Sequence, residues 1–302
     1  MSFPSPLVYP DSTLYPDFAA PVTEGRKISL GGFVLGDIDG RGVDWTISKF
    51  DGWGSSQSTA QFTQRGRGHG STSSDPYLTS RYMTIEGLVK APSLAALDDA
   101  FYRLAAAVTL DQLQMVVAEA AGVKQVAVQR QGEVLPTYLS NKLGKYSILI
   151  AAKDPLKYGD VITATTALPS SSGGLTYPIT YPITYTGISN SGVIHINNPG
   201  SEPAPVYLRV DGQIPAGGWS VNHLGQAKDL AFASSLQLGM GEFVTVDMQK
   251  REVLAQGQAT RNGYVTSRGW FQLDPGPNDI AFSAVAYDPT ALLTLTTYPA
   301  WS

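Results

Sequence analysis

The sequence predicts a mainly β protein in two domains, the first of them α+β because it holds a single helix. Its 302 residues are about twice the usual length of one domain (~150 residues). Glycine (31) and proline (20) are abundant, which favours short strands joined by turns. Several segments alternate apolar and polar residues, the period of a strand with one buried face.

Strands of the first domain are predicted where apolar residues recur at every second position. A hairpin is predicted over residues 126–133, with Gly132 near its tip. The alternating positions are Val43, Trp45 and Ile47, then Met83, Ile85, Gly87 and Val89, then Tyr146, Ile148 and Ile150.

One amphipathic helix is predicted to begin after Ser93, whose hydroxyl can cap the first turn. Asp98 and Asp99 fall on its solvent face. The core-facing positions follow at steps of three and four residues: Leu94, Leu97, Phe101, Leu104 and Val108.

The second half predicts a β-sandwich, because short apolar runs are separated by turn residues. A domain break is predicted near residue 168, where a Pro, Ser and Gly-rich segment begins, giving domains 1–168 and 169–302. The Thr-Tyr-Pro-Ile repeat over 176–185 predicts an extended connector. The strand candidates are 193–196, 206–210, 243–246, 270–273 and 280–285.

Charge and cysteine content exclude several classes of function. The net charge is −4 and only 15% of residues are charged, which disfavours non-specific binding to nucleic acid. Without cysteine there is no disulfide framework, thiolate nucleophile or cysteine metal site. The uncharged stretch 161–201 is too rich in proline and hydroxyls for a membrane span, and the first residues do not resemble a secretory signal.

The sequence predicts no enzyme, cofactor or metal site. Its three histidines do not stand in a metal-binding spacing, and no Gly-x-Ser-x-Gly elbow occurs. The segment Asp37-Ile-Asp39-Gly-Arg41-Gly42 begins like a calcium loop, but Arg41 and Ser48 occupy ligand positions. A turn is therefore predicted there.

Two groups of residues are candidates for binding. Arg65, Arg67 and His69 lie in a glycine-rich loop, interpreted either as a mobile loop or as a basic finger that contacts phosphate or an acidic partner. Trp219, His223 and Trp301 are candidate glycan contacts, whereas Trp270 stands among alternating apolar residues and is predicted to be core.

The order of these segments resembles that of siphophage distal tail proteins over nearly the whole chain. In the first domain the matching pieces are Ile28-Ser-Leu-Gly-Gly-Phe33, Asp44-Trp45, Gly52-Trp53, Arg81-Tyr-Met-Thr-Ile-Glu-Gly87 before the helix, Val128-Gln-Arg130 and Ala152-Lys-Asp-Pro-Leu-Lys-Tyr158. In the second they are Ile196-Asn-Asn-Pro-Gly200, Pro205, Gly241-Glu-Phe-Val-Thr-Val-Asp247, Arg251 and Trp270-Phe-x-Leu273-x-Pro275-Gly276-x-Asn278-x-Ile280-x-Phe282.

The resemblance implies a structural adaptor at the distal end of a phage tail, within the virion. The first domain would be a β-sandwich with one helix and a β-hairpin, forming a hexameric ring of identical copies. The second would be a galectin-like β-sandwich. The partners implied are the tail tube protein and a tail-tip hub or fibre protein, around a path through which DNA passes without specific binding. We expect the lumen of such a ring to carry little net positive charge.

Two other functions remain open on the sequence. The first is an adhesin whose C-terminal domain recognises host cell-wall glycan, which a pulldown that depends on Trp219 would favour. The second is a cell-wall hydrolase, which zymography would reveal.

Overall fold

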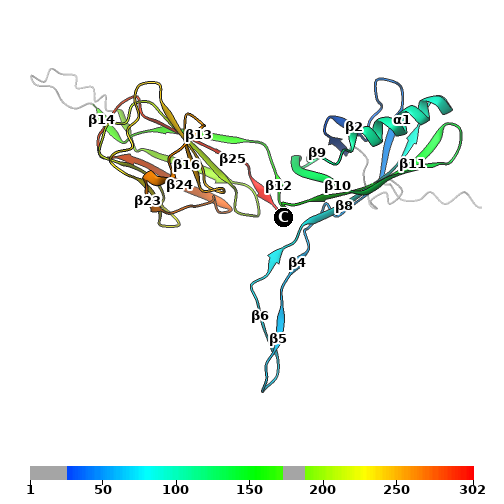
Figure 1. Cartoon of the computed structure of the whole chain (residues 1–302), viewed down its shortest axis with the longest axis horizontal. Helices are drawn as coiled ribbons and strands as arrows, with labels where there is room; N and C mark the ends of the chain where they lie inside the picture. Colours follow the sequence, from blue (N-terminus) through cyan, green and yellow to red (C-terminus); the bar gives the residue numbers. More distant parts are fainter. Residues whose placement is uncertain (1–25, 173–187) are drawn as a thin grey trace, which may run out of the picture. The chain divides into compact units, whose positions relative to one another are not determined.

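The computed structural model describes residues 26–172 and 188–302, which belong to two compact units (Figure 1). The first unit ends at Pro155 and the second begins at Leu156. This boundary precedes residue 168, because strand β13 (Ile162–Ala167) pairs along its length with β25 (Leu292–Thr297) of the second unit. The repeat at 176–185 lies outside the described residues.

The first unit is built on an antiparallel sheet whose longest strand, β10, joins its two halves. Up to Val128, β10 pairs with β9, and from Gln129 onward it pairs with β11. Buried residues of both halves enclose a single core together with the helix. The strand order is β2 (Phe33–Leu35), β1 (Lys27–Leu30), β9 (Leu113–Glu119), β10 (Gly122–Tyr138), β11 (Leu143–Ala152), β8 (Arg81–Lys90) and β3 (Asp44–Asp51).

The hairpin predicted over residues 126–133 is wrong, because this segment lies within the continuous strand β10. Gly132 has a φ of 85° and lies where the pairing with β11 shifts register, between Arg130 and Val134. A glycine with positive φ serves a bulge as well as a turn. Here it lies in a bulge within the pairing of β10 with β11, after β10 has already changed partner at Val128 and Gln129.

The predicted helix is confirmed as α1 (Leu94–Ala107). The Ser93 hydroxyl accepts a hydrogen bond from the Ala96 N–H at 3.2 Å, as a cap should. The buried stripe begins at Leu97, whereas Leu94 in the first turn is 46% exposed and does not join the core. Further along, Phe101 and Leu104 pack inward.

Between β3 and β8 the chain runs out and back as a narrow two-stranded hairpin, which we call the arm (residues 57–79). It consists of two short ladders in series (Figure 1). Its strands are β4 (Ser58–Thr59) with β7 (Tyr77–Leu78), and β5 (Phe62–Gln64) with β6 (Ser71–Ser73).

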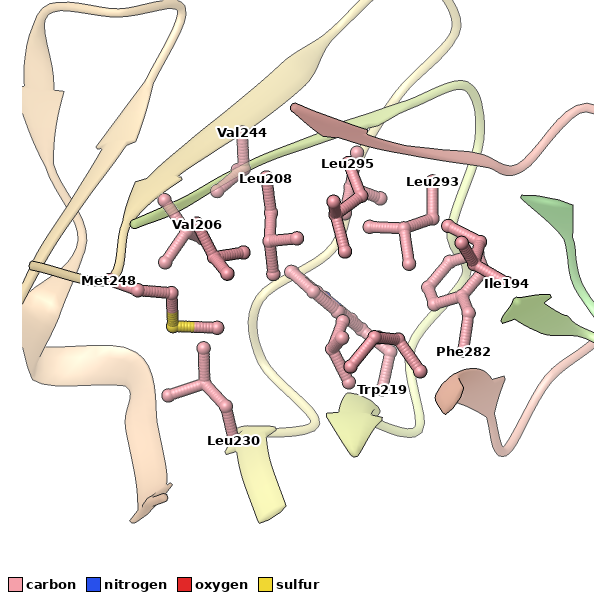
Figure 2. Close-up of a cluster of buried hydrophobic side chains, with 14 of the residues drawn as sticks. Ile194, Val206, Leu208, Trp219, Leu230, Val244, Met248, Phe282, Leu293 and Leu295 are labelled. Atoms are coloured by element: carbon pink, nitrogen blue, oxygen red, sulfur yellow. The ribbon is translucent and has the colours of Figure 1, made fainter. Parts of the chain in front are cut away.

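The second unit is a β-sandwich of two antiparallel sheets, which confirms the predicted architecture. Figure 2 shows side chains of the two sheets meeting in its core, with Leu208, Leu293 and Leu295 opposite Trp219 and Phe282. One sheet has the order β13, β25, β17 (Val206–Asp211), β20 (Phe243–Asp247), β21 (Glu252–Ala255) and β22 (Ala259–Thr260). The other has the order β16 (Val193–Asn198), β24 (Gly276–Ala284), β18 (Trp219–His223), β19 (Lys228–Phe232) and β23 (Val265–Arg268).

Small elements complete this unit, and one predicted strand is absent from it. Residues 270–273 form a loop whose backbone pairs with another segment in one isolated bridge, between Leu273 and Ala204. Here the apolar alternation serves a loop whose Phe271 and Leu273 are buried. The remaining elements are β12 (Lys157–Tyr158) with β26 (Ala300–Trp301), β14 (Ser170–Ser172) with β15 (Ile188–Asn190), and the 3-10 turn η1 (Asn262–Tyr264).

Among the described residues, no helix is both long enough and apolar enough to cross a membrane.

Candidate functional site

Within the described part of the first unit, the arm buries the least surface. Every residue from 61 to 77 is exposed, and among them Phe62 and Tyr77 leave 73% and 66% of their surface open. An isolated two-stranded hairpin is at best marginally stable in water, and its outer edges can pair with another chain. The arm therefore has the character of a surface that another chain covers.

The base of the arm is fixed by one buried arginine. Arg81 is 2% exposed, and its guanidinium donates hydrogen bonds to the carbonyls of Gly52 (2.9 Å), Trp53 (3.0 Å) and Pro155 (2.8 Å). Gly52 precedes the arm and Arg81 follows it. A hydrogen bond from Ser56 Oγ to the same Pro155 carbonyl (3.1 Å) adds to this anchor. The arm thus leaves the sheet from a rigid point.

Three predicted binding residues lie at the arm's tip. Arg65, Arg67 and His69 are all exposed, and the Arg65 N–H donates to the Gly70 carbonyl at 3.2 Å to close the turn between β5 and β6. The glycine-rich loop is therefore the end of a hairpin that presents positive charge. Sequence reasoning found this tip but missed the arm, because its strands are polar and carry no apolar alternation.

The segment that begins like a calcium loop forms a turn tied to the helix. Asp39 accepts the N–H groups of Arg41 (2.9 Å) and Val43 (3.0 Å). Its second carboxylate oxygen pairs with Arg103 at 2.7 Å, and Arg103 also pairs with Asp99 at 2.9 Å. Asp99, predicted to be solvated, therefore joins an ion network between the turn and α1.

These contacts make part of the stability depend on pH. Burial opposes ionisation of Asp39, but the Val43 N–H, the Arg103 guanidinium and the Arg41 N–H outweigh it and lower the pKa of Asp39 from 3.8 to about 2. A lowered carboxyl pKa stabilises the fold above the unfolded value and loses that effect as pH falls through the folded value. Because solvent screens this partly exposed pair, we expect Asp39 to contribute about 1 kcal/mol near neutral pH, lost between about pH 4 and pH 2.

Urea unfolding of the wild type and of Asp39→Asn across this pH range measures the contribution. The difference in unfolding free energy should be largest near neutral pH and shrink towards pH 2. Asp75→Asn, which changes an exposed carboxylate of the arm, is the control and should follow the wild-type curve. A constant difference between wild type and Asp39→Asn would contradict the assignment.

Two of the three predicted glycan contacts are buried in the second unit. Trp219 is 3% exposed and stacks on Phe232 in the core, with ring centroids 3.9 Å apart. His223 is 2% exposed. Trp301 is half-buried, and its ring packs close to Gly159. Neither Trp219 nor His223 presents a ring face to solvent, so the structure does not assemble these three residues into one glycan platform.

A different part of the second unit is hollowed. A cavity of about 620 Å³ is lined by residues of two hairpin turns and of the loop before β24, among them Gln226, Lys228, Arg251, Trp270 and Asp274. Its lining mixes amides, charges and one aromatic ring. Trp270, predicted to be core, both packs against the core and lines this cavity.

Residues 199–296 match the family model described as the siphovirus-type tail component, C-terminal domain. The sequence matches no curated protein. Among solved structures, the SPP1 Dit (gp 19.1) protein, described as a paradigm of the hub adsorption apparatus in phages that infect Gram-positive bacteria, is similar with a TM-score of 0.67. It is 12% identical, and the alignment covers 92% of this chain and 99% of that one.

Two structures of the phage P2 baseplate in its activated conformation, with Ca and with Sr, have TM-scores of 0.49 and 0.48. Each is 11% identical, over 90% of this chain and 97% of the matched chain. The likeness to SPP1 Dit extends over both units and confirms the mainly β fold predicted from the sequence.

Proposed function

We propose that this protein is a structural component of the tail tip, at the distal end of the virion's tail. The proposal rests on the match to the siphovirus-type tail component domain and on the fold shared with a siphophage distal tail protein. Neither the family model nor the matched fold describes an enzyme. In this role the protein is an adaptor between the tail tube protein and a hub or fibre protein. The galectin-like character of the second unit is part of the same proposal.

The uncovered arm is the observation that supports a ring of identical copies. Its exposed aromatic residues and free strand edges need a partner surface, and a second copy of the chain provides one at every position of a closed ring. Such a ring repeats one heterologous interface, in which the arm of each copy contacts a different surface of the next. We propose six copies, around a lumen through which DNA passes without specific binding.

The low charge of the chain is compatible with that lumen. A net charge of −4 spread over 302 residues provides no general attraction for phosphate. The clustered basic side chains at the arm tip then serve a protein partner rather than DNA. A ring structure with a strongly basic lumen would contradict this assignment.

Native mass spectrometry tests both the ring and the role of the arm. The wild type at high protein concentration should show a hexamer. The double variant Phe62→Ser/Tyr77→Ser removes the two exposed large apolar side chains of the arm and should shift the mass to the monomer, with the melting temperature of the monomer unchanged. The loss follows from burial energies of about 1.5–3 kcal/mol for each large apolar side chain at each interface.

The matched control is Met240→Ser, which removes an exposed apolar side chain (89% exposed) from the second unit. It should assemble like the wild type. A wild type that stays monomeric at every concentration would contradict the ring. A hexamer that survives the double arm variant would show that the arm does not hold it.

Glycan recognition by the second unit remains a separate candidate. Trp219 and His223 cannot provide the contacts, because their side chains are buried. The cavity beside Trp270 is the feature that favours it.

A further inference from the structure

The cavity beside Trp270 lies within the second unit, where three loops converge. The turn between β18 and β19 contributes Gln226, the turn between β20 and β21 contributes Gln249 and Arg251, and the loop before β24 contributes Trp270 and Asp274. Its volume of about 620 Å³ falls within the range of sites that hold small ligands (about 300–1,000 Å³).

One wall of the cavity is held by a buried polar network. The Gln226 N–H donates to His223 Nδ1 at 3.1 Å, so that nitrogen is the acceptor and His223 Nε2 carries the proton. Nε2 then donates to Asn278 Oδ1 at 2.9 Å. Asn278 also accepts the Asp274 N–H (3.0 Å) and donates to the Asp274 carbonyl (2.8 Å). His223 therefore positions Gln226 and the Asp274 loop instead of touching a ligand.

This network leaves one acceptor without a partner. Gln226 Nε2 donates to the Gln272 carbonyl at 2.9 Å, whereas the buried Oε1 of Gln226 makes no hydrogen bond to any described residue. A buried acceptor without a hydrogen bond costs about 1–3 kcal/mol. Gln226 lines the cavity, but this oxygen is closed to solvent, so Gln226 shapes the wall and a ligand bonds the open side chains around it.

The remaining side chains define the class of ligand. The amides of Gln249 and Gln272 and the carboxylate of Asp274 are exposed and line the cavity, and together they can bond several hydroxyls. Trp270 adds an aromatic surface on which the C–H face of a pyranose ring can stack. The charged side chains of the lining are of both signs, with Lys228 and Arg251 positive and Asp274 negative. The lining therefore does not strongly favour a polyanion.

We propose that this cavity binds a neutral saccharide. The sugar ring packs on Trp270, and its hydroxyls bond the amides of Gln249 and Gln272 and the carboxylate of Asp274. Because all the side chains come from one unit, the site does not require ring assembly. It adds glycan binding to the proposed tail-tip role and can fail without affecting that role.

A glycan array tests the proposal on the full chain. It carries neutral hexose and N-acetylhexosamine oligosaccharides, and a glycerol phosphate polymer serves as the anionic comparison. The wild type should bind at least one neutral oligosaccharide. Trp270→Ala should weaken that binding about tenfold or more, because the stacking surface is lost. Its oligomeric mass should equal that of the wild type, which separates this test from the test of assembly.

A second variant guards against loss of folding, since Trp270 also packs on the core. Gln249→Ala/Asp274→Ala removes two exposed lining side chains and should reduce binding several-fold without changing the melting temperature. The matched control, Gln258→Ala/Asp160→Ala, changes exposed residues of the same types outside the cavity and should bind like the wild type.

Three outcomes would overturn the proposal. They are no binding of any neutral oligosaccharide by the wild type, binding of the glycerol phosphate polymer alone, and binding that the double lining variant leaves intact.

Discussion

Phe101→Ala is expected to lower the free energy of unfolding of the first unit by about 3–5 kcal/mol. Phe101 is 6% exposed and projects from α1 into the core. Its ring meets Tyr138 edge to face, with centroids 5.1 Å apart. It also lies over Gly144 of β11, where an added Cβ would come within 2.5 Å of the ring. Alanine would remove the ring that fills the space between helix and sheet.

Urea unfolding of the variant measures this loss, and Tyr102→Ala provides the matched control. Tyr102 is the next residue of the helix and is 78% exposed, so its removal should change the unfolding free energy by about 0.5 kcal/mol or less. Equal stability of the two variants would show that α1 does not pack as described.

Gly87→Ala is expected to cost at least about 3 kcal/mol, because the site has no room for a methyl group. Gly87 lies in β8 opposite Ile47 of β3 and Tyr146 of β11. A Cβ there would be 2.0 Å from the Thr46 carbonyl oxygen and 2.4 Å from the Tyr146 hydroxyl. That hydroxyl donates to the same carbonyl at 3.2 Å, so the tyrosine side chain covers the glycine and cannot move aside without losing its partner.

Gly40→Ala tests whether the cost comes from crowding and not from glycine replacement as such. Gly40 is exposed, with no atom within 4 Å of an added Cβ, and the variant should melt at the wild-type temperature. If Gly87→Ala were as stable as Gly40→Ala, the close contact of Tyr146 with β8 would be refuted.

The local sequence pattern is sufficient to predict a strand where the alternation within that strand sets which side chains are buried. The alternation through Met83, Ile85 and Val89 predicts β8, and each of these side chains is buried. Gly87 fits the same alternation, but the reason for glycine there is a tyrosine that lies 59 positions away in the chain and beside it in the sheet. The apolar alternation identifies which face of β8 is buried. Which residue fits at a given position of that face depends on the side chain beside it in the neighbouring strand.

Pattern reasoning failed where the same residues suit two structures. Gly132 suits a turn and a bulge equally, and the choice depends on β9 and β11 both pairing with β10. Apolar residues 270–273 suit a strand and a packed loop, and the structure shows the loop, because its backbone pairing stops at one bridge, from Leu273 to Ala204. The polar strands of the arm carry no apolar period, because neither of their faces meets a core within the chain.

The candidate glycan residues show the same limit. Composition indicated that tryptophan and histidine could contact sugar, but it could not separate Trp219, which fills the core, from Trp270, which lines a cavity. The sequence predicts His223 as a contact, but in the structure its ring lies behind the cavity wall and is bonded to Asn278.

By itself the sequence determined the mainly β class, the single helix, the absence of cysteine chemistry and, through the order of its segments, the resemblance to siphophage distal tail proteins. The first three follow from short-range periodicity and composition, which each segment carries alone, whereas the resemblance rests on the order of the segments along the chain. Only the tertiary structure decided that the chain divides at Pro155, that an uncovered arm leaves the first unit, and that a cavity opens beside Trp270. Each of these depends on which distant strands pair and which loops converge, and such contacts leave no local period in the sequence.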